Sequence, residues 1–245
     1  MSDLISSIRE RYEKVLDTIS TSAHKVRRPP ESVRLVVVTK MQPPEVIQAA
    51  IEAGARMLGE NYAEEAADKI AVLGLQTGVE WHMIGHVQSR KASLVAQHFA
   101  LVHSLDSLRL AQRLNLSASE LGRTLPVLLE FNVSGEKSKH GWEASDESLW
   151  WELLTDANAI ADLPSLKVRG LMTMPPLSTD PEAARTYFRK LRRLRDFLSE
   201  HITQAEWIEL SMGTSVDYAV AIEEDATLVR IGQAILGPRP DAEDK

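Results

Sequence analysis

Arg34-Leu-Val-Val-Val-Thr-Lys40 is a short β-rich run that ends on a charged residue, and our prediction of the fold starts from it. Side chains alternate between the two faces of a strand, so Lys40 shares a face with Val36 and Val38. The residues between them face the other way and can pack on helices. If the valines fill the interior of a barrel, Lys40 points into its mouth, at the carboxyl ends of the strands, where barrel active sites lie.

Seven further β-rich runs follow, and helical patterns separate most of them. The runs cover residues 56–61, 80–85, 101–105, 126–132, 167–174, 206–213 and 227–236. Apolar spacing predicts helices over residues 3–26, 44–53 and 181–201. Eight strands with intervening helices predict an α/β fold, namely a single (β/α)8 TIM barrel over residues 1–237, followed by a loose tail over 238–245. An open doubly wound sheet is the alternative, although eight strands would make it wide.

Composition and charge exclude several classes of protein. Of 245 residues, 44% are hydrophobic, which is enough for a large core and is not typical of a disordered chain. The net charge of −7 argues against a general nucleic-acid binder, and no apolar run is long enough to cross a membrane. Cysteine is absent, so the chain has no disulfide, thiolate nucleophile or cysteine zinc site. We see no secretory signal at the N-terminus and expect a cytoplasmic protein.

The predicted position of Lys40 gives this residue its chemical interest. A buried lysine is costly unless it is paired or neutral, and apolar surroundings favour the neutral amine. A neutral amine can attack an aldehyde to form a Schiff base. The alternative is an ordinary strand-end lysine that reaches solvent or a carboxylate, so the neighbouring motifs must decide.

Two glycine-containing strand ends suggest an anion site beside this lysine. Ser211-Met-Gly-Thr-Ser-Val-Asp217 ends the seventh run and offers hydroxyls and a helix start, and Gly232 follows the eighth run. The loops after strands seven and eight are where barrels commonly bind phosphate. The alternative reading is a helix N-cap with a glycine turn.

Arg230 is predicted to point into the barrel, because its neighbours Val229 and Ile231 lie on the opposite strand face. An interior arginine needs an acceptor. A pyridine nitrogen would serve, and arginine or aspartate is the usual protein partner of that atom. Because arginine does not give up its proton, the ring nitrogen would stay neutral and the ring would be a weaker electron sink. An ion pair with Glu209 or Glu130 is the alternative.

Six sequence motifs of this chain follow one another in the same order as in a known protein family. They are Val37-Val-Thr-Lys40, Gly59-Glu-Asn-Tyr62, Trp81-His-Met-Ile-Gly-His86, Gly170-Leu-Met-Thr-Met174, Ser211-Met-Gly-Thr-Ser215 and Arg230-Ile-Gly232. Together they resemble the pyridoxal phosphate homeostasis proteins, from about residue 3 to 237. The sequence departs from that family at Val87-Gln-Ser-Arg-Lys91, at Thr214 and at Leu236, which leaves details of the third loop and the phosphate shell open.

The resemblance implies a fold-type III barrel, like the N-terminal domain of alanine racemase, that holds pyridoxal 5'-phosphate as a Schiff base on Lys40. It further implies that Asn61 and Ile84 flank the ring and that Arg230 meets the pyridine nitrogen. The phosphate would lie among Ser211, Gly213, Thr214 and Gly232. The family is linked to vitamin B6 and amino-acid homeostasis without an established activity.

We therefore expect a monomeric carrier or regulator of pyridoxal phosphate with no catalytic residues, whose partners include apoenzymes that use this cofactor. The domain that supplies the second acid/base group in alanine racemases is not expected here. One alternative is an amino-acid racemase that uses Lys40 as its single base. Another is a barrel enzyme that forms an imine between Lys40 and a phosphorylated metabolite.

Two histidines near the end of the third strand, His82 and His86, raise the question of a metal site. No third ligand has convincing spacing in the sequence, so we predict none. We expect His82 to be a packed or hydrogen-bonded core residue and His86 to line the mouth of the pocket. The polar loop of residues 132–141 is expected either to be solvated or to contact phosphate or a partner.

Overall fold

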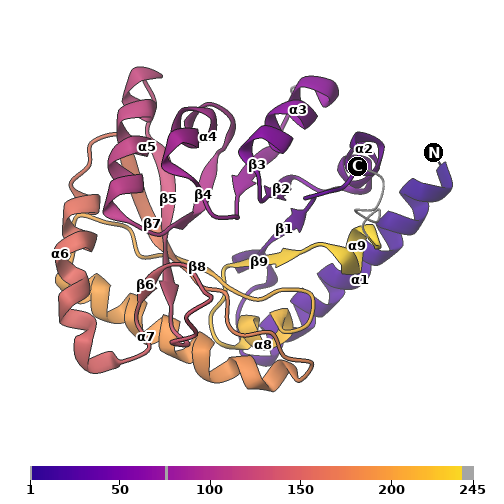
Figure 1. Cartoon of the computed structure of the whole chain (residues 1–245). Coiled ribbons are helices and arrows are strands. Elements are labelled where there is room, and N and C mark those ends of the chain that lie inside the picture. Colours follow the sequence, from indigo (N-terminus) through magenta and orange to yellow (C-terminus); the bar gives the residue numbers. More distant parts are fainter. Residues whose placement is uncertain (1, 75–76, 239–245) are drawn as a thin grey trace.

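The computed structural model describes residues 2–74 and 77–238 and contains a closed barrel of parallel strands (Figure 1). The strands are β1 (Arg34–Val38), β2 (Met57–Glu60), β3 (Glu80–Met83), β4 (Leu101–Leu105), β5 (Leu125–Asn132), β6 (Trp142–Glu143), β7 (Leu166–Met172), β8 (Glu209–Ser211) and β9 (Leu228–Ile231). Their order is β4-β3-β2-β1-β9-β8-β7-β5-β6, and a parallel pairing between β4 and β5 closes the ring. This closure excludes the open doubly wound sheet.

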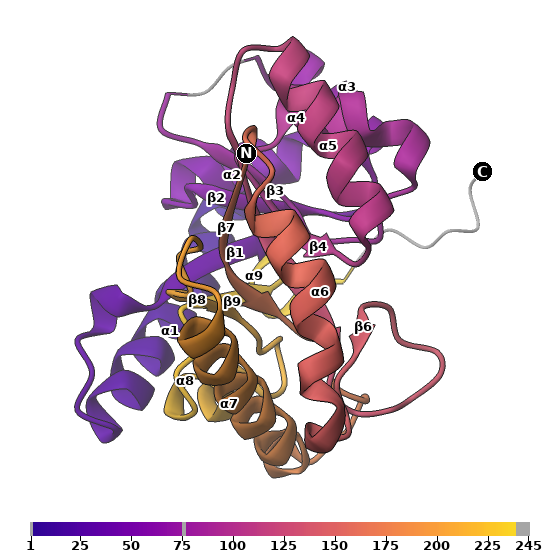
Figure 2. The ribbon, with the colours of Figure 1, turned by 90° about the vertical axis from the view of Figure 1, so that its left-hand side faces the viewer.

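Helices surround the barrel and cover its outer surface (Figures 1 and 2). They are α1 (Ser2–Lys25), α2 (Pro44–Ala53), α3 (Ala63–Leu73), α4 (Ala92–His98), α5 (Leu108–Glu120), α6 (Trp150–Ala161), α7 (Arg185–His201), α8 (Tyr218–Glu223) and α9 (Gln233–Leu236). From α1 to α8 each helix contacts the next one along the chain, and α8 contacts α1. The ring of helices is therefore closed like the ring of strands.

Strand alternation divides the apolar side chains into an inner and an outer core. The inner cluster fills the barrel and consists of Val36, Leu101, Leu128, Met172 and Leu228, with Met57 packed against it. The residues beside Val36 in β1, Leu35 and Val37, belong instead to the large cluster between strands and helices. The two faces of β1 thus point as predicted, with Val36 in the interior and its neighbours against helices.

Most predicted elements occur at the expected places, with a few corrections. The helix expected over residues 3–26 is α1, and the helix expected over residues 44–53 is α2 with the same bounds. The segment 181–201 begins with a short 3-10 turn, Pro181–Ala184, before α7. The strand predicted over residues 227–236 was too long, because β9 ends at Ile231 and α9 begins at Gln233.

One further strand was not predicted, and one prediction falls mostly on residues outside those described. The two-residue strand β6 was not predicted, and it pairs with the end of β5. Of the expected loose tail, residues 239–245 lie outside the described residues. Among the helices of the described segments, none combines the length and the apolar character needed to cross a bilayer.

Candidate functional site

A cavity of about 280 Å³ opens at the carboxyl ends of the strands, the end at which barrel enzymes bind their substrates. Its size is close to the lower end of the range for small-molecule sites, roughly 300–1,000 Å³. Side chains from most of the barrel strands or the loops after them meet there. The lining residues are Val38, Lys40, Asn61, Ile84, His86, Glu130, Lys139, His140, Met172, Met174, Thr214, Ser215, Arg230, Gly232 and Gln233.

Lys40 lies two residues beyond the end of β1 and lines this cavity. The sequence prediction extended the strand to Lys40, but the regular pairing of β1 stops at Val38. Lys40 still follows the inward-facing side of β1, because Val36 belongs to the barrel interior and Val38 lines the cavity with Lys40.

The backbone on both sides of Lys40 is held by a buried ionic network from β2 and α3. Lys69 is buried, and its Nζ atom donates to the Thr39 carbonyl oxygen at 2.8 Å. The same Nζ atom contacts Glu60 Oε1 at 2.7 Å and Glu65 Oε1 at 2.6 Å. On the other side of Lys40, the Met41 amide donates to Glu65 Oε1 at 2.6 Å.

The Thr39 side chain joins this network as well, since its hydroxyl donates to Glu60 Oε1 at 2.6 Å. Burial raises the pKa of Glu60, and the charge and hydrogen bond of Lys69 oppose that rise. The network thus anchors Thr39 and Met41, the two neighbours of Lys40 in the chain. We define Glu60, Glu65 and Lys69 as the Lys69 clamp.

Arg230 extends from β9 into the closed interior and is almost fully buried. Its guanidinium donates to the Ser211 hydroxyl, and its Nη2 atom lies 2.9 Å from both the Thr173 carbonyl oxygen and the Met174 sulfur. Burial lowers the pKa of Arg230 to about 10, with Glu130 and Asp217 opposing the shift, so the group is cationic at neutral pH. The two ion-pair partners considered from the sequence do not contact it: Glu209 pairs with Arg34, and Glu130 acts only at longer range.

A chain of buried hydrogen bonds continues from Arg230 toward the opposite end of the barrel. The Ser211 hydroxyl lies 2.7 Å from His103 Nδ1, and His103 Nε2 lies 3.0 Å from His82 Nδ1. Burial, which is the largest cause, lowers the pKa of His103 well below its ordinary value, and the positive charge of Arg230 adds to the shift. The prediction that His82 is a hydrogen-bonded core residue is confirmed.

The loop after β8 presents only part of its polar groups to the cavity. Thr214 and Ser215 line it, while Ser211 is fully buried behind Arg230. The carboxylate of Asp217 accepts from the amide and the hydroxyl of Thr214, at 2.7 and 3.1 Å. Gly213 has a φ of +94°, and a Cβ atom there would meet the Ala221 Cβ atom at 2.6 Å, so the loop packs tightly on α8.

Glu130 from β5 adds a titratable group to the same cavity. Burial raises the pKa of this carboxyl to about 7, and the negative charge of Asp106 adds to the rise while Arg230 opposes it. The carboxyl therefore exchanges a proton near neutral pH, which is the property of a general acid or base.

The structure brings six of the eight predicted site residues together in the cavity lining: Lys40, Asn61, Ile84, Thr214, Arg230 and Gly232. Ser211 and Gly213 are not among the lining residues. His86 lines the mouth as predicted. Sequence reasoning gave no individual role to His140, Met174 or Gln233, although Met174 and Gln233 lie in predicted strand runs and His140 lies in the polar loop of residues 132–141.

A comparison with known proteins identifies the relatives of this chain. The chain matches the family described as alanine racemase, N-terminal domain, over residues 16–240. It is 39% identical over 238 residues to a pyridoxal phosphate homeostasis protein of Vibrio alginolyticus, covering 96% of this chain and 99% of the relative. A protein of the same name from Escherichia coli (strain K12) is 40% identical over 239 residues, covering 96% and 98%.

A solved structure is also similar over nearly the whole chain. PipY of Synechococcus elongatus PCC7942, with PLP bound, superposes with a TM-score of 0.79 and 34% sequence identity. The match covers 94% of this chain and 100% of that one.

Proposed function

The chain belongs to the family of pyridoxal phosphate homeostasis proteins, which share the alanine racemase N-terminal domain, and on that premise we propose that it binds pyridoxal 5'-phosphate covalently through Lys40. One observation carries the proposal: Lys40 and the buried cation Arg230 line the same cavity. An amine that can capture an aldehyde and a donor suited to a ring nitrogen thus face one small space.

The residues of the cavity fit this cofactor by the chemistry of their donors. A guanidinium has five N–H donors, and the three bonds of Arg230 among the described residues use three of them. Two donors are left for a ligand in the cavity that Arg230 lines. The cofactor supplies an electrophilic aldehyde carbon and a pyridine ring when bound, and Arg230 keeps the nitrogen of that ring unprotonated.

We assign the phosphate to the side of the cavity formed by the loops after β8 and β9. Thr214, Ser215 and Gly232 line that side, which supports the role predicted for Thr214 and Gly232. Ser211 supports the site from behind, because its hydroxyl accepts the hydrogen bond of Arg230. Gly213 serves by letting the loop pack closely on α8. Asn61 and Ile84, also in the lining, flank the ring.

The physiological role that we propose is that of a carrier or regulator of the cofactor. The names of the relatives from Vibrio alginolyticus and Escherichia coli support homeostasis of pyridoxal phosphate. In this proposal the chain acts as a monomer in the cytoplasm, takes up the free aldehyde on Lys40 and releases it to apoenzymes.

Titration of cofactor-free protein with pyridoxal phosphate tests the proposed binding. The visible absorbance of a lysine-bound cofactor should appear at one equivalent in the wild type and be absent in Lys40→Ala. Lys139→Ala is the matched control, because Lys139 is the other lysine in the cavity lining and its loss should leave the band. Binding that gives no such band, or a band that persists in Lys40→Ala, would contradict the proposal.

A racemase that uses Lys40 as a base is the second candidate function. The raised pKa of Glu130, about 7, favours it, since this carboxyl is a second group in the cavity able to exchange a proton. Turnover of an amino acid by the purified protein distinguishes this candidate from a carrier.

A further inference from the structure

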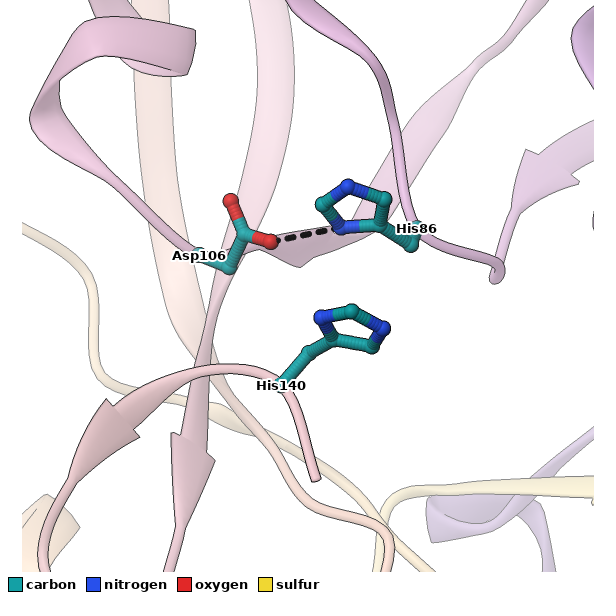
Figure 3. A group of neighbouring side chains, drawn as sticks. All are labelled: His86, Asp106 and His140. Atoms are coloured by element: carbon teal, nitrogen blue, oxygen red, sulfur yellow. Dashed lines mark hydrogen bonds and ion pairs between the residues drawn. The ribbon is translucent and has the colours of Figure 1, made fainter. Parts of the chain in front are cut away.

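Three side chains from three neighbouring strand ends meet on the rim of the cavity: His86, Asp106 and His140 (Figure 3). His86 follows β3, Asp106 directly follows β4, and His140 belongs to the loop after β5. These strands are neighbours in the barrel, because β4 pairs with both β3 and β5. One ligand atom of each side chain lies within 4.8 Å of those of the other two.

We propose that His86, Asp106 and His140 bind a divalent transition-metal ion of the zinc class. Imidazole nitrogens and carboxylate oxygens are ligands of zinc, and sites with three protein ligands keep a fourth position open. His86 and His140 line both the Lys40 cavity and an adjoining cavity of about 500 Å³. The ion would therefore lie where the two cavities meet, with its open position accessible to a small ligand.

Hydrogen bonds hold two of the proposed ligands, His86 and Asp106, in place. Asp106 Oδ1 accepts from the Ser107 hydroxyl at 3.2 Å, while Oδ2 lies 2.8 Å from His86 Nδ1. The carbonyl of Gly85, which precedes His86, accepts from the Ser104 hydroxyl at 2.5 Å. Supporting hydrogen bonds of this kind orient ligands in metal sites. The Asp106 side chain is only 11% exposed, so its carboxylate is the fixed anchor of the three.

Metal binding requires two local changes. The rings of His86 and His140 are stacked, with centroids 4.3 Å apart and planes 13° apart, so their in-plane lone pairs do not yet converge on one point. Within residues 2–74 and 77–238 no hydrogen bond restrains the His140 ring, which is exposed and can rotate. The ion also takes the place of a proton shared by His86 Nδ1 and Asp106 Oδ2, and that proton leaves to solvent.

The test is a titration of tag-free, chelator-treated protein with Co²⁺, followed by absorbance, and with Zn²⁺, followed by calorimetry. We expect one ion per chain in the wild type, with visible Co²⁺ bands. His140→Ala and Asp106→Asn should each weaken binding at least tenfold, since each removes one of three ligands. His24→Ala, which removes an exposed histidine in α1, should bind as the wild type does.

Circular dichroism of each variant shows whether it is folded, and the wild-type titration decides the question even if a variant is not. The proposal is overturned if the wild type shows no saturable binding, or if folded His140→Ala binds as tightly as the wild type. It does not depend on the proposed cofactor: Lys40→Ala should still bind Co²⁺, so the two proposals fail separately.

Discussion

His103 Nδ1 lies 2.7 Å from the hydroxyl oxygen of Ser211 in the closed interior of the barrel. The Ser211 hydroxyl is fully buried, and among the described residues its hydrogen-bond partners are Arg230, which can only donate, and His103 Nδ1. The Ser211 proton must then point to His103 Nδ1, so the neutral ring of His103 carries its proton on Nε2. That proton points to His82 Nδ1, 3.0 Å away.

The order of donors continues to the opposite end of the barrel. His82 accepts on Nδ1, so its remaining proton lies on Nε2, the atom that is 3.5 Å from Glu80 Oε2. In every hydrogen bond of this series, the donor therefore lies on the Arg230 side and the acceptor on the Glu80 side. This order of donors requires a neutral His103 ring, and the lowered pKa of His103 agrees with it.

Ser211→Ala should destabilise the protein by about 1–3 kcal/mol, because it leaves a donor of Arg230 and the acceptor Nδ1 of His103 buried without a partner. Urea unfolding followed by circular dichroism measures the loss. Ser93→Ala, at an exposed position of α4, should change stability by less than about 0.5 kcal/mol. Equal effects of the two substitutions would show that the buried chain does not support the barrel.

Lys69→Met should cost about 3–5 kcal/mol, because it leaves the buried Glu60 without its cation. The folded variant should also bind pyridoxal phosphate more weakly, since the Lys69 clamp holds the neighbours of Lys40. Chemical unfolding and cofactor titration check the two effects, with Lys14→Met, at an exposed position of α1, as control. A folded Lys69→Met protein with wild-type affinity would refute the positioning role of the clamp.

Ionisation of Glu130 should lower the free energy of unfolding as pH rises from about 4.5 to 7. Its pKa is about 7 in the folded protein against an ordinary value of 4.5, so between these values the folded state holds a proton that the unfolded state has lost. The stabilisation is complete below 4.5 and is lost above 7, and its size is on the order of 3 kcal/mol.

Glu130→Gln, which carries no titratable group, should remove this part of the pH profile and be more stable than the wild type above pH 7. Asp106 and Arg230 act on the carboxyl by charge, and the other titratable groups of the cavity are Lys40, His86, Lys139 and His140. Unfolding free energies of both proteins from pH 4 to 8, in steps of about one unit, measure the difference. Parallel profiles would contradict the assigned pKa.

The sequence predicted the elements whose pattern is local. β1 and α2 were found because alternation and helical spacing are complete within each, and Arg230 was placed inside the barrel by the alternation of its neighbours. His103 was missed although the same signal was present. Leu101, two residues earlier on the same face of the strand, is an interior residue, so strand alternation places His103 in the interior as well. The end of β9 was misplaced, because the apolar run continues into α9 past Gly232.

Features that depend on distant segments could not be predicted. β6 has only two residues and is a strand through its pairing with β5. The contact of His86 with Asp106 and His140 joins three loops that are brought together only by the closure of the barrel. The spacing of His82 and His86 pointed to a pair that the structure separates, one in the core and one on the rim.

The carrier proposal predicts no turnover of free amino acids. Wild-type protein loaded with cofactor should leave the enantiomeric ratio of each amino acid unchanged, as measured by chiral chromatography after prolonged incubation. Racemisation that Lys40→Ala abolishes would instead support the racemase candidate, and Glu130→Gln would then show whether the second group takes part. Racemisation that survives in Lys40→Ala would point to a contaminating enzyme.

The most direct test of the central claim is to locate the bond between protein and cofactor. Protein loaded with pyridoxal phosphate is treated with borohydride, digested, and its peptides are sequenced by mass spectrometry. We predict one modified residue, Lys40, at full occupancy, with Lys139 unmodified. Modification at Lys139 instead, or scattered over exposed lysines, would contradict the account.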